Sequence, residues 1–184
     1  MRIITGRYKN RPILSPKGLK TRPTSSRLRE TLFDICQSYI EGSFFLDLFA
    51  GSGAMGLEAL SRGAEKVFFV ESDPNSIRCI RQNIEAFQAG NEARVIAGDA
   101  FLGIKKLMAS GNSFEIIYAD PPYGTYGSKL LASLANNPIL KPSGMLFIED
   151  ESGHEDMQEK FEDLTLVSLR RSGRATLQQW QKQL

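Results

Sequence analysis

The stretch FFLDLFAGSGAMG, residues 44–56, decides the fold. Its first seven residues are apolar except for Asp47, a pattern typical of a buried strand in a parallel sheet. A charged side chain in such a strand is costly unless it is hydrogen-bonded, so Asp47 is a candidate functional residue. The glycine segment at residues 51–56 ends the strand and leads into a helix that stops near Gly63. We therefore expect a strand, a tight turn and a helix in succession.

The glycine segment matches the pattern G-x-G-x-x-G, and Glu71 ends the next predicted strand, residues 66–71. A glycine pattern between a strand and a helix, with an acid about 20 residues later, is the setting in which a nucleotide-binding fingerprint is meaningful. Glycines let the backbone approach a ligand, and Glu71 can accept hydrogen bonds from two ribose hydroxyls. NAD and S-adenosylmethionine both fit this segment. The alternative to nucleotide binding is a glycine turn that serves only packing.

Strands alternate with helices along the rest of the chain. Further strands are predicted at residues 94–97, 114–119 and 145–148, with helices at about 73–87, 101–108 and 128–136. This alternation predicts a doubly wound, Rossmann-like α/β domain over residues 24–184. We also expect a turn at residues 141–144, and an antiparallel pair at one edge from residues 164–169 and 175–180.

The fourth predicted strand leads directly into the motif Asp120-Pro121-Pro122-Tyr123. Ligands of open α/β sheets bind beyond the carboxyl ends of the strands, where this motif lies. Two consecutive prolines remove two backbone donors and hold Asp120 and Pro121 extended. A carboxylate, nearby carbonyl groups and the Tyr123 ring suit a planar base with an exocyclic amino group. A Pro-Pro turn with a surface tyrosine is the alternative that the motif alone leaves open.

Three features favour S-adenosylmethionine over NAD. Asp47 lies just before the glycines, where it can meet the ammonium group of the methionine part. Asp99 ends the third predicted strand and is placed to bind an adenine amino group. The Asp-Pro-Pro-Tyr motif has no use in hydride transfer, and no histidine or lysine is a candidate acid or base for a dehydrogenase. We therefore expect S-adenosylmethionine as the cofactor, with an NAD-dependent reductase as the alternative.

The composition is that of an ordinary globular protein, because 41% of its 184 residues are hydrophobic and 24% are charged. No apolar run reaches the length of a membrane span and no signal-peptide pattern is present, so we expect a cytoplasmic protein with no membrane partner. Cys36 and Cys79 fit reduced core thiols. With only these cysteines and His154, neither a metal site nor a Ser-His-Asp or Cys-His pair is expected.

Positive charge is concentrated at the N-terminus. Residues 1–29 hold nine basic residues and no acid, whereas residues 30–184 hold 14 basic and 21 acidic residues, a net charge of −7. A basic segment joined to an acidic body predicts a nucleic-acid-binding arm, with a merely solvated tail as the alternative. The candidate RNA-binding residues are Arg2, Arg7, Lys9, Arg11, Arg22, Arg27 and Arg29. The last three can instead hold the first helix against the cofactor site.

The first residues are expected to form a small unit of their own. Lys9 and Asn10 can turn a short hairpin, and Pro16, Gly18 and Pro23 interrupt the chain that follows. We expect residues 1–23 to form a small basic hairpin extension with a loop. Thr24 is expected to cap the first helix.

Several segments together resemble one known family. The motif at residues 120–123 resembles that of amino-directed nucleic-acid methyltransferases, which act on adenine, cytosine or guanine. The whole chain is similar to the bacterial 16S rRNA guanine-N2 methyltransferases, which modify one small-subunit guanine. The matching segments are MRII with Gly6, TRPT (21–24) with Arg27, RETLF (29–33), LDLFAGSG (46–53), GLEALSRGA (56–64), GDA (98–100) and DPPY (120–123). The resemblance runs from residue 1 to about 124 and is weak from about residue 150, where a tail with Arg170, Arg171 and Arg174 can place RNA differently.

The resemblance implies an activity and the residues that carry it. The activity is methyl transfer from S-adenosylmethionine to the exocyclic N2 of a guanine in 16S rRNA within a small-subunit particle, without a metal; a monomer is expected. The implied catalytic residues are Asp120, Pro121, Pro122 and Tyr123. The implied cofactor-binding residues are Asp47, Phe49, Ala50, Gly51, Ser52, Gly53, Glu71, Ser72, Asp99 and Ala100. A DNA adenine-N6 methyltransferase with the same motif, and a non-catalytic RNA-binding assembly protein, are the alternatives.

Overall fold

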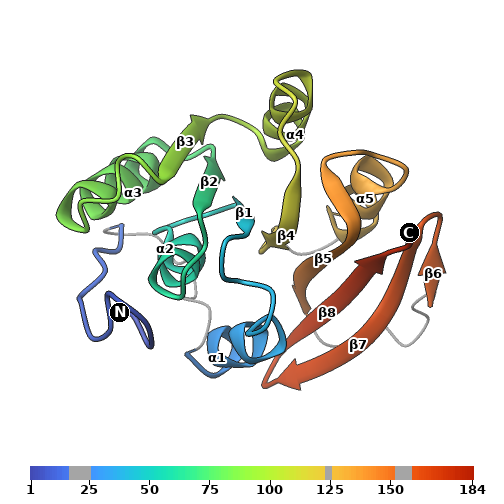
Figure 1. Ribbon diagram of the computed structural model, residues 1–184, viewed down its shortest axis with the longest axis horizontal. Helices are drawn as coiled ribbons and strands as arrows, with labels where there is room; N and C mark the ends of the chain where they lie inside the picture. Colours follow the sequence, from blue (N-terminus) through green and yellow to red (C-terminus); the bar gives the residue numbers. More distant parts are fainter. Residues whose placement is uncertain (17–25, 123–125, 152–158) are drawn as a thin grey trace.

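A computed structural model describes residues 1–16, 26–122, 126–151 and 159–184. Its centre is one eight-stranded sheet with the strand order β3-β2-β1-β4-β5-β8-β7-β6 (Figure 1). The strands are β1 (Phe44–Leu48), β2 (Lys66–Glu71), β3 (Ala93–Ala97), β4 (Phe114–Ala119), β5 (Leu140–Glu151), β6 (Lys160–Phe161), β7 (Leu164–Ser172) and β8 (Ala175–Lys182). The strands β1 to β5 pair in parallel, which confirms the doubly wound sheet predicted from the sequence.

Helices cover both faces of the parallel strands. The helices of the described residues are α1 (Ser26–Ile35), α2 (Ala54–Ser61), α3 (Pro74–Ala86), α4 (Ala100–Ala109) and α5 (Tyr126–Leu134). In Figure 1, α1, α2 and α3 lie on one side of the sheet, and α4 and α5 lie on the other. The order of the strands reverses between β1 and β4, and their carboxyl ends meet where a ligand of an open α/β sheet is expected. None of these described helices is both long and apolar enough to cross a lipid bilayer.

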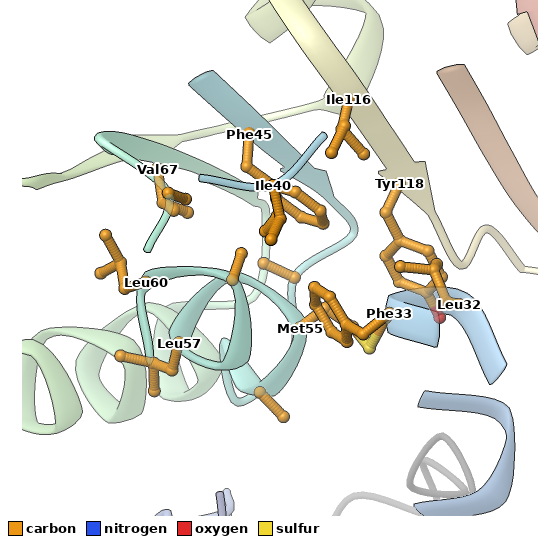
Figure 2. Packing of buried hydrophobic residues seen from close by; sticks show 14 of the residues in the cluster. Leu32, Phe33, Ile40, Phe45, Met55, Leu57, Leu60, Val67, Ile116 and Tyr118 are labelled. Carbon is orange, nitrogen blue, oxygen red and sulfur yellow. The ribbon is translucent and has the colours of Figure 1, made fainter. Parts of the chain in front are cut away.

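The core consists of two apolar layers, one on each face of the sheet. In the first layer, Val67 of β2 lies near Leu60 of α2, Phe45 of β1 lies beside Ile40, and Tyr118 of β4 lies beside Leu32 of α1 (Figure 2). The second layer packs α4 and α5 against the opposite face. Successive residues of a strand point to opposite faces, so the layer that a residue joins follows from its position in the strand.

The C-terminal strands extend the sheet beyond β5. The predicted antiparallel pair is confirmed as β7 and β8, but β8 is not at the edge, because it lies between β5 and β7. The turn predicted at residues 141–144 is wrong, since these residues lie inside β5. The pairing of β4 with β5 shifts register there, and Ser143 has a φ of 60°. A local irregularity therefore replaces the turn.

The N-terminal arm, residues 1–16, is packed onto the domain. Its two extended stretches run antiparallel through an isolated bridge between Arg2 and Pro12, and Asn10 has a φ of 66° in the turn between them. Ile3 and Ile13 are buried in the first core layer. The backbone N–H groups of Ile4 and Thr5 donate to the carboxylate of Glu58 in α2, at 2.8 and 3.0 Å.

One close approach fixes the arm on this helix. A Cβ added at Gly6 would lie 1.8 Å from the carbonyl oxygen of Ser61, the last residue of α2, and the φ of Gly6 is +87°. Only glycine therefore lets the arm lie this close to the helix. The predicted loop after residue 16 and the predicted cap Thr24 lie outside the described residues.

Candidate cofactor and substrate site

The glycine turn between β1 and α2 has a strained backbone. Phe49 has a φ of 59°, and Gly51 and Gly53 have φ values of 56° and 77°. A Cβ at Gly53 would lie 3.2 Å from the ring of Phe69, so a larger residue would be both strained and crowded. Non-glycine residues in the left-handed region cluster at functional sites, and Phe49 is such a residue. The turn lies at the carboxyl edge of the sheet, as predicted.

Asp47 of β1 is buried with one oxygen satisfied and the other not. Its side chain is 1% exposed, and Oδ2 accepts a hydrogen bond of 2.9 Å from the backbone N–H of Gly56. Its Oδ1 is buried and has no hydrogen-bond partner in the described residues. Burial raises the pKa of Asp47, with smaller contributions from the charges of Glu71 and Asp120 against the lowering effect of the Gly56 bond. An unpaired buried carboxylate oxygen fits a cationic group of a cofactor.

Glu71, at the end of β2, ties the glycine turn to the next connection. Its Oε2 accepts from the backbone N–H of Gly51 at 2.7 Å. Its Oε1 accepts from the N–H groups of Ser72 and Asp73 at 2.7 and 2.8 Å. The carboxylate therefore shapes the turn directly, a role that the sequence did not reveal. A carboxylate oxygen can accept more than one hydrogen bond, so these backbone contacts leave Glu71 able to accept from ribose hydroxyls as well. That predicted ribose contact stays a prediction.

Asp99 begins α4 as its N-cap. Its Oδ1 accepts from the N–H groups of Phe101 and Leu102 at 2.9 and 3.2 Å. Ala100 is buried directly after it. The predicted contact of Asp99 with an adenine amino group stays a prediction. The predicted cap of α3 is confirmed, since Asp73 accepts from Ser76 at 2.7 Å with proline at the first helical position.

Three aromatic rings gather next to these loops. The Tyr126 ring lies 6.2 Å from that of Phe49, edge to face, and 6.3 Å from that of Phe101, stacked. Sequence reasoning included Phe49 but missed Phe101 and Tyr126. The available signal was their position in the sequence. Phe101 comes shortly after the end of β3 and Tyr126 shortly after the end of β4, so both lie near the carboxyl edge of the sheet. The rings give this edge of the sheet an apolar aromatic border.

Asp120 follows the last residue of β4. Its backbone N–H donates to the Leu48 carbonyl at 3.5 Å, which holds it beside the end of β1. Its side chain is half-buried; Pro121 is buried and Pro122 is exposed. Burial and then the charge of Glu149 raise the pKa of Asp120 to about 7. Tyr123 lies outside the described residues, as does residue 124, so the predicted stacking ring stays a prediction.

A second buried acid accompanies Asp120, and the sequence reasoning missed it. The hydroxyl of Tyr118 in β4 donates to Oε2 of Glu149 in β5 at 2.8 Å. Ala119 pairs with Ile148, so Asp120 and Glu149 follow adjacent residues of neighbouring strands. Asp47 pairs with Tyr118 in the register of β1 and β4. The alternation of the strands places all four side chains on the face that α1 covers.

The described cations of the N-terminal arm lie on its surface, and two of them contact α3 and the loop that follows it. Arg7 forms a 2.7 Å ion pair with Glu92, and Arg11 donates to the Ala86 carbonyl. The guanidinium of Arg11 also lies 4.6 Å from the ring centroid of Phe87, which stacks edge to face on Tyr8. Arg2, Lys9 and Arg27 are exposed. Arg22 lies outside the described residues.

Arg29 corrects one predicted RNA contact. Its side chain is 2% exposed, and its guanidinium donates to the Arg2 carbonyl at 2.9 Å and to the Met1 sulfur at 2.9 Å. A buried guanidinium cannot reach a phosphate on the surface. Arg29 instead holds the arm against α1, which is close to the structural alternative considered for it.

Comparisons with known proteins agree with this geometry. Residues 1–181 match the family described as conserved hypothetical protein 95. Haemophilus influenzae ribosomal RNA small subunit methyltransferase D is 35% identical over 154 residues, covering 82% of this chain and 79% of that protein. The Escherichia coli protein of that name is 35% identical over 152 residues, covering 82% and 75%.

A solved structure has the same architecture. The structure of yhhF from Escherichia coli matches with a TM-score of 0.88 and 30% identity, covering 100% of this chain and 98% of that one. The family resemblance read from the sequence is thereby confirmed. The chain belongs to the family described as conserved hypothetical protein 95, as a relative of the ribosomal RNA small subunit methyltransferases D.

Proposed function

We propose that this protein transfers a methyl group from S-adenosylmethionine to the exocyclic N2 of a guanine in 16S rRNA. One observation carries the proposal, namely two acids that lie on one face of the sheet at the ends of adjacent strands. Asp47 has a buried Oδ1 without a partner in the described residues, beside the glycine turn. Asp120 follows the neighbouring strand. One acid is placed for a cofactor cation and the other for a substrate amino group.

The residues around the glycine turn fit S-adenosylmethionine. When bound, this cofactor supplies a methyl group on a positively charged sulfur, which is a good leaving group. Asp47 would hold the ammonium group, and the turn at residues 49–53 would let the backbone approach the ligand. Glu71 would accept from the ribose hydroxyls, and Asp99 from the adenine amino group. The partnerless oxygen of Asp47 supports this placement, because a buried carboxylate oxygen needs a donor.

The motif residues would align the amino group of the base. The guanine amino nitrogen is a poor nucleophile, because its lone pair is delocalised into the ring. Asp120 would accept one amino hydrogen and the Pro121 carbonyl another, which turns the lone pair toward the methyl group. The nitrogen gains the methyl group and loses a proton. With a pKa raised to about 7 by burial and by Glu149, Asp120 is a suitable acceptor for that proton.

The base must leave its own stack to reach this edge of the sheet. Tyr123 would stack on it there, and the exposed cations of the N-terminal arm would contact the surrounding phosphates. The choice of 16S rRNA in a small-subunit particle is supported by the relatives, which are named ribosomal RNA small subunit methyltransferases. The methylated atom is inferred from the motif and from the resemblance of the sequence.

The decisive experiment is labelled methyl transfer from S-adenosylmethionine to 16S rRNA and to small-subunit particles from cells that lack this protein. Nucleoside analysis of the product identifies the modified atom. N2-methylguanosine is expected with the parent protein, and its loss is expected with Asp120→Asn. N6-methyladenosine in the product would overturn the target, and absence of any transfer to either substrate would overturn the activity.

A further inference from the structure

The turn between β7 and β8 reaches the same edge of the sheet as the candidate site. It is a two-residue turn with Gly173 at a φ of 65° and Arg174 beside it. Because β8 runs antiparallel to β5, Leu177 lies beside Glu149 and Ala175 lies beside Glu151. Strand spacing of about 4.8 Å and a rise of about 3.4 Å per residue place the backbone of Arg174 roughly 14 Å from that of Asp120.

Three arginines surround this turn; we call Arg170, Arg171 and Arg174 the arginine tip. All three are exposed. Arg170 pairs with Leu177 and Arg171 with Thr176, so successive guanidinium groups leave opposite faces of the ribbon, and Arg174 lies at its end. In the described part of the chain, none of the three forms an ion pair or a hydrogen bond through its guanidinium group.

Three other cations of the described residues are engaged within the protein. Arg62 forms an ion pair with Glu58, Lys141 with Glu115 and Lys182 with Asp163. The arginine tip therefore concentrates unpaired positive charge at one end of the sheet. Val167 and Leu169, which are 51% and 46% exposed, lie just before it on β7. Arginine in such a place can contact phosphates and stack on unpaired bases.

We propose that the arginine tip is a second RNA-binding surface, which contacts phosphates that flank the target nucleotide on the β5 side of the site. This proposal rests on the proposed function. The carboxyl edge beside the arginine tip carries buried or half-buried acids, namely Asp47, Asp120 and Glu149, and these offer no positive charge to RNA. The engaged cations of the N-terminal arm lie at the opposite, amino edge of the sheet, since Arg7 pairs with Glu92 just before β3 and Arg11 contacts the C-terminal end of α3. Phosphate contacts at the arginine tip would therefore hold the RNA beside a flipped base at this edge.

The test compares two triple variants with the same loss of charge. The first is Arg170→Ala, Arg171→Ala and Arg174→Ala. The control is Lys105→Ala, Lys106→Ala and Lys160→Ala, whose side chains are exposed in α4 and at the start of β6, away from the carboxyl edge. A third variant, Arg170→Lys, Arg171→Lys and Arg174→Lys, keeps the charge. Affinity for deproteinised 16S rRNA is measured across a range of salt concentrations.

The arginine-to-alanine variant is expected to bind 16S rRNA at least tenfold more weakly at low salt. The slope of log affinity against log salt should fall by about 0.7–0.9 for each lost phosphate contact, and by about 2–3 if all three contact RNA. The control should keep the parental slope, and the lysine variant should regain most of it. Thermal shift with S-adenosylhomocysteine should be parental in all three, which shows that each variant is folded.

Two outcomes would overturn the proposal. One is an alanine variant of the arginine tip with the slope and affinity of the control. The other is normal binding to 16S rRNA with weakened binding to small-subunit particles, since the arginine tip would then contact a ribosomal protein. Failure of the proposed function can be told apart from failure of this proposal. In that case the parental protein would bind RNA through the arginine tip without methylating it.

Discussion

Asp120 and Glu149 lie side by side, because Ala119 of β4 and Ile148 of β5, the residues before them, are register partners. Two partly desolvated carboxyl groups next to each other cannot both ionise easily. The Glu149 carboxylate accepts from Tyr118, so it is held at this point. Burial and this neighbour together raise the pKa of Asp120 to about 7. The acid proposed to contact the substrate therefore titrates within the physiological range.

The first prediction concerns the pH dependence of methyl transfer. Asp120 can take up the amino proton only when it is ionised, so activity should rise with pH through a midpoint near the raised pKa of about 7. Glu149→Gln removes the neighbouring negative charge and should move that midpoint to lower pH. Glu115→Gln, a carboxylate paired with Lys141 elsewhere, is the matched control and should leave it in place. Profiles of kcat/KM with the same midpoint in both variants would contradict the role of Glu149.

The second prediction concerns stability. Because the pKa of Asp120 is raised in the folded protein, the folded state holds this proton more tightly than the unfolded state does. The stabilisation is complete below the ordinary pKa of 3.8 and is lost as the pH rises through about 7. Asp120→Asn should therefore be more stable than the parent at about pH 8, and the difference should shrink toward about pH 4. Urea unfolding at several pH values measures this, and a difference independent of pH would count against it.

The third prediction concerns the buried carboxylate of β1. Asp47→Asn keeps the size of the side chain but removes the charge proposed to hold the cofactor ammonium. A hydrogen bond to a charged group is worth about 1.5–3 kcal/mol, so affinity for S-adenosylhomocysteine should fall by about tenfold or more. The free protein should remain folded, because the buried charge is unfavourable there. Calorimetry measures the affinity for S-adenosylhomocysteine. Asp120→Asn is the control and should bind it normally. Parental affinity in Asp47→Asn would place the ammonium group elsewhere.

The fourth prediction separates the site from the helix that follows it. Glu71→Ala removes the acceptor of the Gly51 N–H together with the proposed ribose contact, so cofactor affinity should fall by about tenfold or more. Asp73→Ala removes the N-cap of α3 and should cost about 0.5–2 kcal/mol of stability without changing affinity by more than a small factor. Binding titrations and thermal unfolding of both variants decide this. Equal loss of affinity in both would mean that loop order, rather than the ribose contact, is being measured.

The fifth prediction concerns the N-terminal arm. Replacing Arg2, Arg7, Lys9 and Arg11 by alanine should weaken RNA binding and flatten its salt dependence, by about 0.7–0.9 in slope for each phosphate contact. The loss should be smaller than four contacts would give, because Arg7 already pairs with Glu92. Thermal shift with S-adenosylhomocysteine should stay parental. A salt titration with unchanged slope and affinity would assign these cations to packing alone.

The parallel half of the fold was predictable, because its signals are local. Buried strands such as β2 are continuous apolar runs, and the glycine turn and the Asp73 cap mark where helices begin. The position of β8 between β5 and β7 was not predictable, since strand order depends on contacts between distant segments. The same is true of residues 141–144, where proline and glycine signalled a turn but pairing of β5 with β4 on both sides of them, at Leu140 and Met145, kept them in the sheet.

The candidate site was predictable where a residue follows a strand, as Asp120 does, or interrupts one, as Asp47 does. Glu149 was missed because its importance comes from the neighbouring strand, although alternation does place it on the face of Phe147. Arg29 was assigned to RNA on its charge alone. Its spacing held the opposite signal, since it shares a helical face with the buried Phe33 and Cys36.

The docking of the arm on Glu58 has a consequence for how the chain tolerates shortening. Glu58 is fully buried and has three donors, the N–H groups of Ile4 and Thr5 and the Nε of Arg62 at 2.9 Å. A start site a few residues downstream would delete the first two and leave a desolvated carboxylate with one partner. It would also uncover the core beneath Ile3. Shortened forms are therefore expected to be turned over rapidly in the cell through loss of stability, whatever the arm does with RNA.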